Sequence, residues 1–241
     1  MGGGVMRFDV LTIFPGVFPG PLGVGVVGRA IDRGVLSLHV HDLRDHTDDR
    51  HRQVDDEPFG GGAGMVLKAA PIIRAVRHLR EGVPRLRAVL LSPQGRRFDQ
   101  RVAAELAGEA AVLLVCGRYQ GVDERAREEI GEEISVGDYV LSGGEVAAMA
   151  VIEATARLVP GVVGSQESLR NETFATGERS TGFESPLYTR PARFEDQEVP
   201  AVLRSGDHAA IEWWRREEAE RRVKSWRPDL IRSPTGPGGA S

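Results

Sequence analysis

The chain has 241 residues, of which 41% are apolar and 27% are charged, a composition that predicts one large globular domain or a domain with a small appendage. Its net charge of −4 disfavours a nonspecific nucleic-acid coat, and its single cysteine, Cys116, excludes a disulfide framework. No apolar run is long enough to span a bilayer and no signal peptide is evident, so we expect a cytoplasmic protein without a membrane partner.

Strands and helices alternate along the first two thirds of the chain, as judged from periodicity and turn residues. The predicted elements are a strand at 8–14, a short helix near 28–33, a strand at 35–40, a long ordered loop at 42–66, a helix at 67–81, a strand at 87–91, a helix at 98–108 capped by Asp99, a strand at 111–115, a short run at 133–136 and a helix at 144–158. The alternation predicts an α/β fold with a mostly parallel sheet that helices cover on both faces.

The last third of the chain has a different character. Residues 162–190 lack periodicity and are rich in polar residues and glycine, which is typical of a lid or a linker. A long helix at 207–225 predicts a small helical domain. We therefore expect four parts: an α/β domain at 1–163, a flexible linker or lid at 164–185, a helical domain at 186–232 and a disordered tail at 233–241.

Three glycine-bearing loops, each after a short apolar run, are the main functional signal. They are Leu91–Gly95, Cys116–Gly121 and Val136–Gly144. Ligands of open α/β sheets bind just past the carboxyl ends of the strands, and glycine lets a ligand approach the backbone closely. The loops therefore predict one pocket lined mostly by backbone.

Several other motifs are ambiguous. Gly23–Gly28 matches the dinucleotide fingerprint, but three prolines separate it from the preceding strand, so we expect an ordinary loop there. Gly60–Gly64 is equally consistent with a mobile loop near a polyanionic substrate and with a plain flexible loop. Four histidines lie among aspartates without a zinc-binding spacing, so a polar or RNA-facing loop and no metal are expected: His39, His41, His46 and His51.

Charged residues follow the third glycine loop. Arg157 ends the helix at 144–158, where it could simply complement the negative end of the helix. Glu167 and Glu172 lie in the aperiodic segment beyond, where glutamates are usually only solvated. A mobile segment beside a pocket is also where a closing lid carries a catalytic base, and this reading is favoured.

These motifs together resemble the bacterial tRNA (guanine-37-N1)-methyltransferases of the SPOUT class, which are knotted enzymes that use S-adenosylmethionine. The resemblance runs from about Met6 to Leu230. Its segments are Leu91–Gly95, Cys116–Glu124, Gly137–Glu145, Asp49–Asp56, Gly60–Met65, Pro160-Gly161, Tyr188–Pro191 and Val202–His208.

The resemblance implies a C-terminal trefoil knot in the α/β domain and a homodimer with a shared active site. The implied donor-binding residues are Leu91, Ser92, Pro93, Gln94, Gly95, Gly117, Tyr119, Val136, Gly137, Asp138, Tyr139, Val140, Leu141, Gly143 and Gly144. The implied substrate-binding residues are Asp49, Arg50, His51, Gly61, Gly62, Arg190, Ser205 and His208. Magnesium is left open as a further cofactor.

The resemblance also implies the reaction: methyl transfer from S-adenosylmethionine to N1 of guanine 37 in the anticodon loop of tRNA, with no role for DNA. Arg157 assists and an acidic residue takes the N1 proton. This chain has Glu172 where the family typically has Asp, and Gln120 where it commonly has Glu. Alternatives are a SPOUT enzyme that modifies another RNA base or a ribose 2′-OH, and a noncatalytic RNA-binding relative.

Overall fold

The computed structural model describes residues 5–165, 169, 172–174 and 183–231. The chain divides into two compact units, Met1–Gly164 and Ser165–Ser241. The predicted tail at 233–241 and most of the predicted linker at 164–185 lie outside the described residues.

The first unit contains a five-stranded sheet with the strand order β2-β1-β6-β5-β7. All neighbouring strands are parallel, which confirms the predicted mostly parallel sheet. The strands are β1 (Met6–Thr12), β2 (Leu36–Asp42), β5 (Arg87–Arg97), β6 (Ala111–Cys116) and β7 (Glu133–Ser135).

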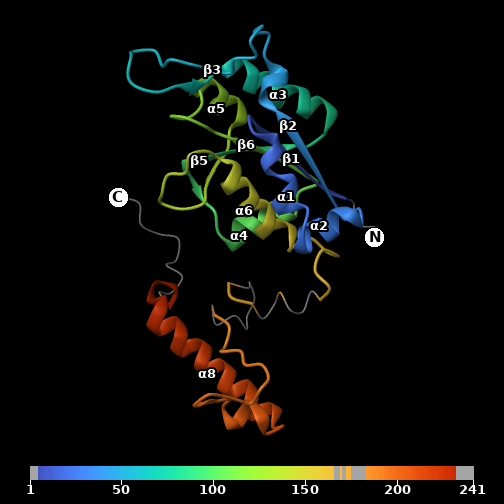
Figure 1. Ribbon diagram of the computed structural model, residues 1–241, viewed down its shortest axis with the longest axis vertical. Helices are drawn as coiled ribbons and strands as arrows, with labels where there is room; N and C mark the ends of the chain where they lie inside the picture. Colours follow the sequence, from blue (N-terminus) through green and yellow to red (C-terminus); the bar gives the residue numbers. More distant parts are fainter. Residues whose placement is uncertain (1–4, 166–168, 170–171, 175–182, 232–241) are drawn as a thin grey trace, which may run out of the picture. The chain divides into compact units, whose positions relative to one another are not determined.

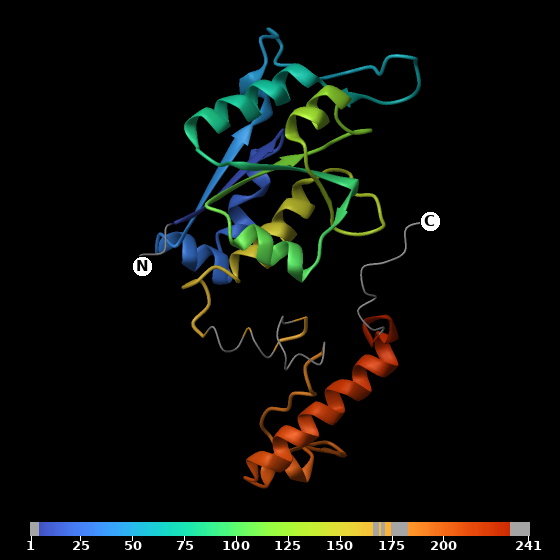
Figure 2. The ribbon, with the colours of Figure 1, turned by 180° about the vertical axis from the view of Figure 1, so that it is seen from behind.

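Helices cover both faces of this sheet, so the first unit has three layers (Figures 1 and 2). One face carries α1 (Pro19–Leu22), α2 (Gly25–Asp32), α4 (Gln100–Ala107) and α6 (Glu145–Ala156), and the other carries α3 (Ala69–Gly82) and α5 (Glu124–Ile130). Asp99 caps α4 as predicted, since its side chain accepts hydrogen bonds from two backbone amides of the first turn. Helix α5 was not among the predicted elements.

Strand β6 shows why the sheet is buried on both faces. Val112, Leu114 and Cys116 belong to the core beneath α4 and α6, whereas Leu113 and Val115 belong to the core beneath α3 and α5. Successive side chains of a strand point to opposite faces, so a continuous apolar run supplies both cores at once.

Strand β5 contains an irregularity that the sequence did not reveal. Leu91 and Arg96 both pair with Ile134 of β7, so residues 92–95 bulge out between them. The first glycine loop is therefore an excursion within a long strand and does not follow the end of that strand. Its residues leave the plane of the sheet without breaking the β5–β7 pairing.

The segment at 42–66, predicted as one loop, contains some regular structure. It begins with a 3₁₀ turn, η2 (Leu43–His46), and includes β3 (Asp55–Asp56), which pairs antiparallel with β4 (Val66–Leu67). The pairing closes the glycine-rich residues 57–65 into a loop. A second 3₁₀ turn, η1 (Pro15–Val17), follows β1.

The second unit is built around α8 (His208–Trp226), close to the helix predicted at 207–225. The side chain of Asp207 caps it by accepting hydrogen bonds from the amides of Ala209 and Ala210. Further elements among its described residues are β8 (Arg193–Phe194), β9 (Gln197–Glu198), η3 (Ala201–Arg204) and η4 (Pro228–Ile231).

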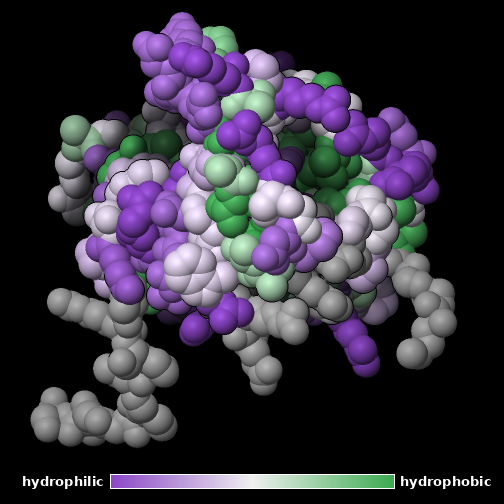
Figure 3. All heavy atoms as spheres, turned by 90° about the horizontal axis from the view of Figure 1, so that it is seen from below, coloured by the Kyte–Doolittle hydropathy of each residue, from purple (hydrophilic) through white to green (hydrophobic). Residues whose placement is uncertain are grey.

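Figure 3 shows one face on which hydrophilic side chains form extended areas, with smaller hydrophobic areas between them. Within the part of the chain that the structure describes, no helix has the length and apolar character needed to cross a membrane.

Candidate active site

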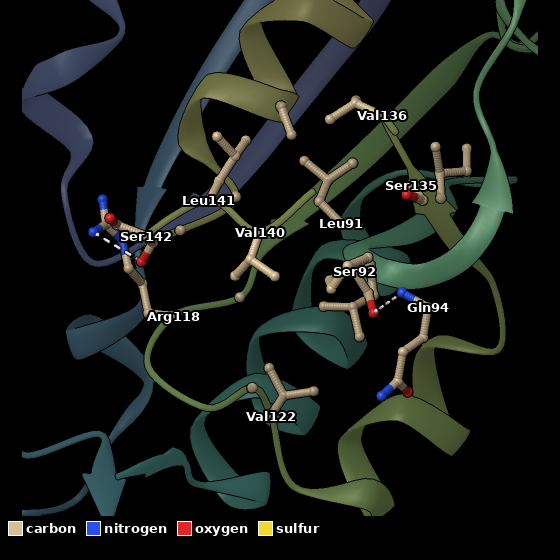
Figure 4. A pocket seen from close by; sticks show the side chains of 18 of the residues that line it. Leu91, Ser92, Gln94, Arg118, Val122, Ser135, Val136, Val140, Leu141 and Ser142 are labelled. Carbon is tan, nitrogen blue, oxygen red and sulfur yellow. Dashed lines mark hydrogen bonds between the residues drawn. The ribbon is translucent and has the colours of Figure 1, made fainter. Parts of the chain in front are cut away.

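One pocket of about 410 Å³ lies beside β5, β6 and β7, and all three predicted glycine loops line it. This volume is typical of sites that bind small molecules. Figure 4 shows Arg118 at one side of the pocket and Ser92 and Gln94 at the other, with Leu91 and Val140 between them. The prediction that three separate loops build a single pocket is confirmed.

The pocket lining includes all the predicted donor-binding residues except Gly95 and Asp138. Gly95 is constrained by packing, because a Cβ at this position would lie 2.5 Å from the carbonyl carbon of Glu133. Glycine therefore lets β5 approach the backbone of β7 after the bulge. The predicted contact of Gly95 with the donor stays a prediction.

Ten further residues line the pocket besides the predicted donor-binding residues. They are Leu90, Arg118, Gln120, Gly121, Val122, Arg127, Ile134, Ser135, Ser142 and Ala147. Several of them lie inside the three loops and could have been included on that ground. Arg127 lies on α5, so its position depends on a helix that was not predicted.

Two glycines of the third loop are favoured for different reasons, Gly137 by its backbone conformation and Gly144 by close approach. Gly137 has a φ of +151°, and a Cβ on it would lie 2.6 Å from the ring of Tyr139. A Cβ on Gly144 would lie 2.8 Å from the Cα of Cys116, and the Gly144 amide donates to the carbonyl of Gly117 at 2.9 Å. The second and third loops are therefore in direct backbone contact at the pocket.

A buried carboxylate joins three elements beneath the pocket. Glu145, at the start of α6, is only 3% exposed. Its Oε1 accepts a hydrogen bond from Thr12 Oγ1 at 2.7 Å, and its Oε2 accepts one from Arg118 Nε at 2.9 Å. The hydrogen bonds satisfy the buried charge and fix the end of β1, the loop after β6 and the start of α6 relative to one another.

Arg118 also reaches across the loops. Its Nη1 donates to the carbonyl of Ser142 at 3.3 Å (Figure 4), and its guanidinium lies 4.5 Å from the ring centroid of Phe14. The side chain is therefore held by an ion pair, a backbone carbonyl and an aromatic face together. Such a fixed cation shapes the pocket wall.

Two weakly acidic side chains, Tyr119 in the pocket lining and Cys116 next to it in the chain, are not activated as nucleophiles. Burial, together with the negative charge of Glu145, raises the pKa of the Cys116 thiol well above its ordinary value. Burial, with Asp55 nearby, also raises the pKa of the Tyr119 hydroxyl. Both groups stay protonated near neutral pH, so the pocket is suited to binding and alignment.

The histidines of 39–51 do not gather into a metal site. His41 Nε2 lies 2.7 Å from Oδ1 of the buried Asp9, and the His46 ring packs against His78 at a centroid distance of 5.9 Å. Within the described residues, no group of three or more histidine, cysteine, aspartate or glutamate side chains could hold a metal ion.

The predicted substrate-binding residues of the first unit lie on exposed loops. Asp49 Oδ1 accepts hydrogen bonds from the amide of Gln53 at 3.3 Å and from that of His51 at 2.7 Å, and these bonds lower its pKa. Asp49 therefore folds the turn that presents Arg50 and His51. Gly61 and Gly62 are exposed at positive φ.

The predicted substrate-binding residues of the second unit are exposed as well. Ser205 Oγ donates to the carbonyl of Val202 at 2.8 Å and accepts from the amide of Asp207 at 3.1 Å, so it shapes the turn before α8. His208 is the first residue of α8, and Arg190 precedes β8.

The two predicted catalytic residues belong to different units. Arg157 follows the last residue of α6 in the first unit, is half-buried and does not belong to the pocket lining. Glu172 belongs to the second unit and is also half-buried.

The chain is similar in sequence to proteins of one known family. Residues 6–233 match the model of the family described as tRNA (guanine-1)-methyltransferase TrmD. A protein of Geotalea uraniireducens named tRNA (guanine-N(1)-)-methyltransferase is 49% identical over 227 residues, which cover 94% of this chain and 90% of that protein.

Proteins with the same name occur among other similar sequences. That of Heliobacterium modesticaldum is 50% identical over 233 residues, covering 94% of this chain and 84% of its own length. The protein of Dictyoglomus turgidum is 48% identical over 227 residues, which cover 94% of this chain and 90% of that protein. The chain therefore belongs to the tRNA (guanine-1)-methyltransferase TrmD family.

Proposed function

We propose that this protein transfers a methyl group from S-adenosylmethionine to N1 of guanine 37 in the anticodon loop of tRNA. Methylation of guanine N1 in tRNA is the reaction of its family. The single observation that carries the proposal is that the family match spans residues 6–233 and includes all three loops of the pocket.

The pocket fits a compact, partly apolar donor. Its apolar side chains include Leu91 and Val140, and its loops bring backbone amides and carbonyls to the same space. Gly137 and Gly144 stand where a Cβ would collide with neighbouring atoms. Backbone groups can therefore hydrogen-bond the polar edges of a nucleoside, while apolar side chains cover its faces.

When bound, S-adenosylmethionine supplies an electrophilic methyl group on a sulfonium. Neutral guanine N1 carries a proton and lacks an available lone pair, so a base must remove that proton. Glu172 supplies the carboxylate for this step. Arg157 donates hydrogen bonds to guanine O6, where negative charge develops as N1 loses its proton.

The rest of the pocket aligns the reactants and does not compete for the methyl group. The network of Thr12, Glu145 and Arg118 holds the loops in position before the substrate binds. The thiol of Cys116 has a raised pKa and stays protonated, so it is a poor nucleophile.

Both units contact the tRNA in this proposal. Residues 1–163 hold the donor, 164–185 act as a linker or lid, and 186–232 bind tRNA. The contacts are assigned to Asp49, Arg50, His51, Gly61, Gly62, Arg190, Ser205 and His208, with arginines of α8 on the phosphate backbone. Guanine 37 leaves its stack to reach the pocket, which an unpaired loop permits.

The assembly proposed for the enzyme is a homodimer with a shared active site, whose donor loops belong to a trefoil knot. The proposed tRNA substrate supports a cytoplasmic location for the reaction. The family assignment supports these features, and magnesium is left open as an additional cofactor.

The test is to incubate the protein with tRNA and methyl-labelled S-adenosylmethionine and then to digest the tRNA to nucleosides. The proposal expects the label in 1-methylguanosine. Label in another methylated base or in a 2′-O-methylated ribose would overturn the assigned atom, and the absence of label would overturn the activity.

A further inference from the structure

Phe59 has a side chain that the fold leaves entirely in solvent. It is 103% exposed and lies in the loop at 57–65 between β3 and β4. Scattered exposed apolar residues are common, but a wholly exposed phenyl ring on a structured loop next to an active-site pocket is a candidate for binding.

The loop that carries Phe59 is attached to the wall of the donor pocket. The Gln120 amide donates to the carbonyl of Met65 at 3.1 Å, and the Leu67 amide donates to the carbonyl of Gly121 at 3.0 Å. The side-chain amide of Gln120 also donates to the carbonyl of Ala63. Gln120 and Gly121 line the pocket, so the loop projects from its rim.

The residues that follow Phe59 leave open space around the loop. Gly60, Gly61 and Gly62 all have positive φ, and an added Cβ at any of them would have no atom within 4 Å. The glycines therefore allow a backbone path that carries the ring away from its own chain. They also leave room for a second flat group beside the ring.

The charges near Phe59 decide which part of an RNA can approach it. Asp55, Asp56 and Glu57 precede it, and Lys68 pairs with Asp56 at 3.6 Å between Nζ and Oδ2. An acidic flank of this kind repels phosphate groups, whereas the face of a nucleobase carries no net charge. The chemistry at this position therefore favours a base over the sugar–phosphate backbone.

We infer that Phe59 stacks on an unpaired base of the substrate RNA at the rim of the donor pocket. Proteins commonly bind unpaired bases by stacking them on aromatic rings. When one guanine leaves the anticodon loop, its neighbours lose stacking contacts, and an aromatic ring can replace them. This role rests on the proposed function and adds a residue that positions the RNA.

The first test compares methylation kinetics of the full-length protein with those of Phe59→Ala, Phe59→Tyr and Phe59→Leu. Phe59→Ala is expected to raise KM for tRNA about tenfold, equivalent to about 1.4 kcal/mol, with little change in kcat. Phe59→Tyr should restore KM, whereas Phe59→Leu, which is apolar but has no aromatic face, should not. Val24→Ala removes another exposed apolar side chain and serves as the control.

The second test repeats the comparison with tRNAs in which single anticodon-loop nucleotides are abasic. The rise in KM caused by Phe59→Ala should disappear for the transcript that lacks the stacked base. It should persist for the other transcripts. An unchanged KM in Phe59→Ala, a full rescue by Phe59→Leu, or an altered oligomeric state as the cause of the defect would overturn the inference. Failure of the unmodified protein to form 1-methylguanosine would instead overturn the proposed function.

Discussion

Glu172 carries the proton transfer in the proposed reaction, and its carboxylate is the only part of the side chain that the chemistry requires. We expect Glu172→Gln to lower kcat by about 10²- to 10⁴-fold, because an amide cannot accept the N1 proton. Donor affinity, measured by calorimetry, should not change. Glu172→Asp keeps the carboxylate one methylene shorter and should retain far more activity, so undiminished turnover by Glu172→Gln would contradict the assignment.

Asp9 is a fully buried carboxylate away from the pocket, and its charge makes a pH-dependent contribution to stability. Burial acts to raise its pKa, but hydrogen bonds from His41 and Arg7 outweigh burial, so the net shift is downward. A lowered pKa in the folded state means that the stabilisation is complete above the ordinary aspartate pKa of about 3.9 and is lost as the pH falls through the lower folded value.

We therefore expect Asp9→Asn to lower the free energy of unfolding by about 2 kcal/mol at pH 7, since it weakens the charged hydrogen bonds with Arg7 and His41. The difference in unfolding free energy between Asp9→Asn and the unmodified protein should become smaller below about pH 4. Urea unfolding at pH 7, 5 and 3 measures it, with Asp32→Asn on the exposed end of α2 as the control. A difference that stays constant over this range would contradict the account.

At the scale of elements, the close approach of β5 to β7 depends on Gly95. Gly95→Ala places a Cβ 2.5 Å from backbone atoms of Glu133 and Ile134, so the strands must separate. We expect a loss of about 1–3 kcal/mol in unfolding free energy and weaker donor binding, because the displaced bulge lines the pocket. Gly82→Ala at the end of α3 is the control, since its Cβ meets nothing within 4 Å. Equal losses of unfolding free energy in Gly95→Ala and Gly82→Ala would contradict this packing role.

The central strands could be predicted from the sequence because their signal is local. A run such as 111–115 is apolar at every position and so supplies both cores of the sheet. Helix α5 was missed because it buries only Ala126 and Ile130. Its capping residues were a usable signal: Asp123 accepts a hydrogen bond from the Arg125 amide at the start, and Gly131 ends the helix with a φ of +83°.

The position of the pocket could be predicted where glycine marks a close approach of other groups to the backbone. Gly144 fits that expectation, whereas Gly137 reflects its backbone conformation and Gly95 reflects contact between strands. The partnership of Glu145 with Thr12 could not be predicted, because the residues are 133 positions apart and only the parallel sheet brings them together. The bulge in β5 was likewise invisible, since it is a matter of register with β7.

At the scale of the whole molecule, the first unit has its own hydrophobic cores. Among the described residues, both core clusters are drawn from the first unit, between Met6 and Val162. We expect a fragment of residues 1–164 to unfold cooperatively and to bind the donor with an affinity comparable to that of the full chain. It should not methylate tRNA, because Glu172 lies beyond its end. Calorimetry measures the unfolding and the donor binding, and an assay with labelled donor measures the methylation. Methylation by the fragment would contradict the role assigned to Glu172.

In the proposed reaction, specificity for guanine 37 is a property of the whole molecule, because the donor pocket, the carboxylate of Glu172 and the proposed RNA-binding residues must act on one nucleotide. The most direct measurement incubates the full-length protein with labelled S-adenosylmethionine and two transcripts of one tRNA that carry G or A at position 37. The account predicts that label enters the G37 transcript and not the A37 transcript. Equal labelling of the two transcripts would contradict it.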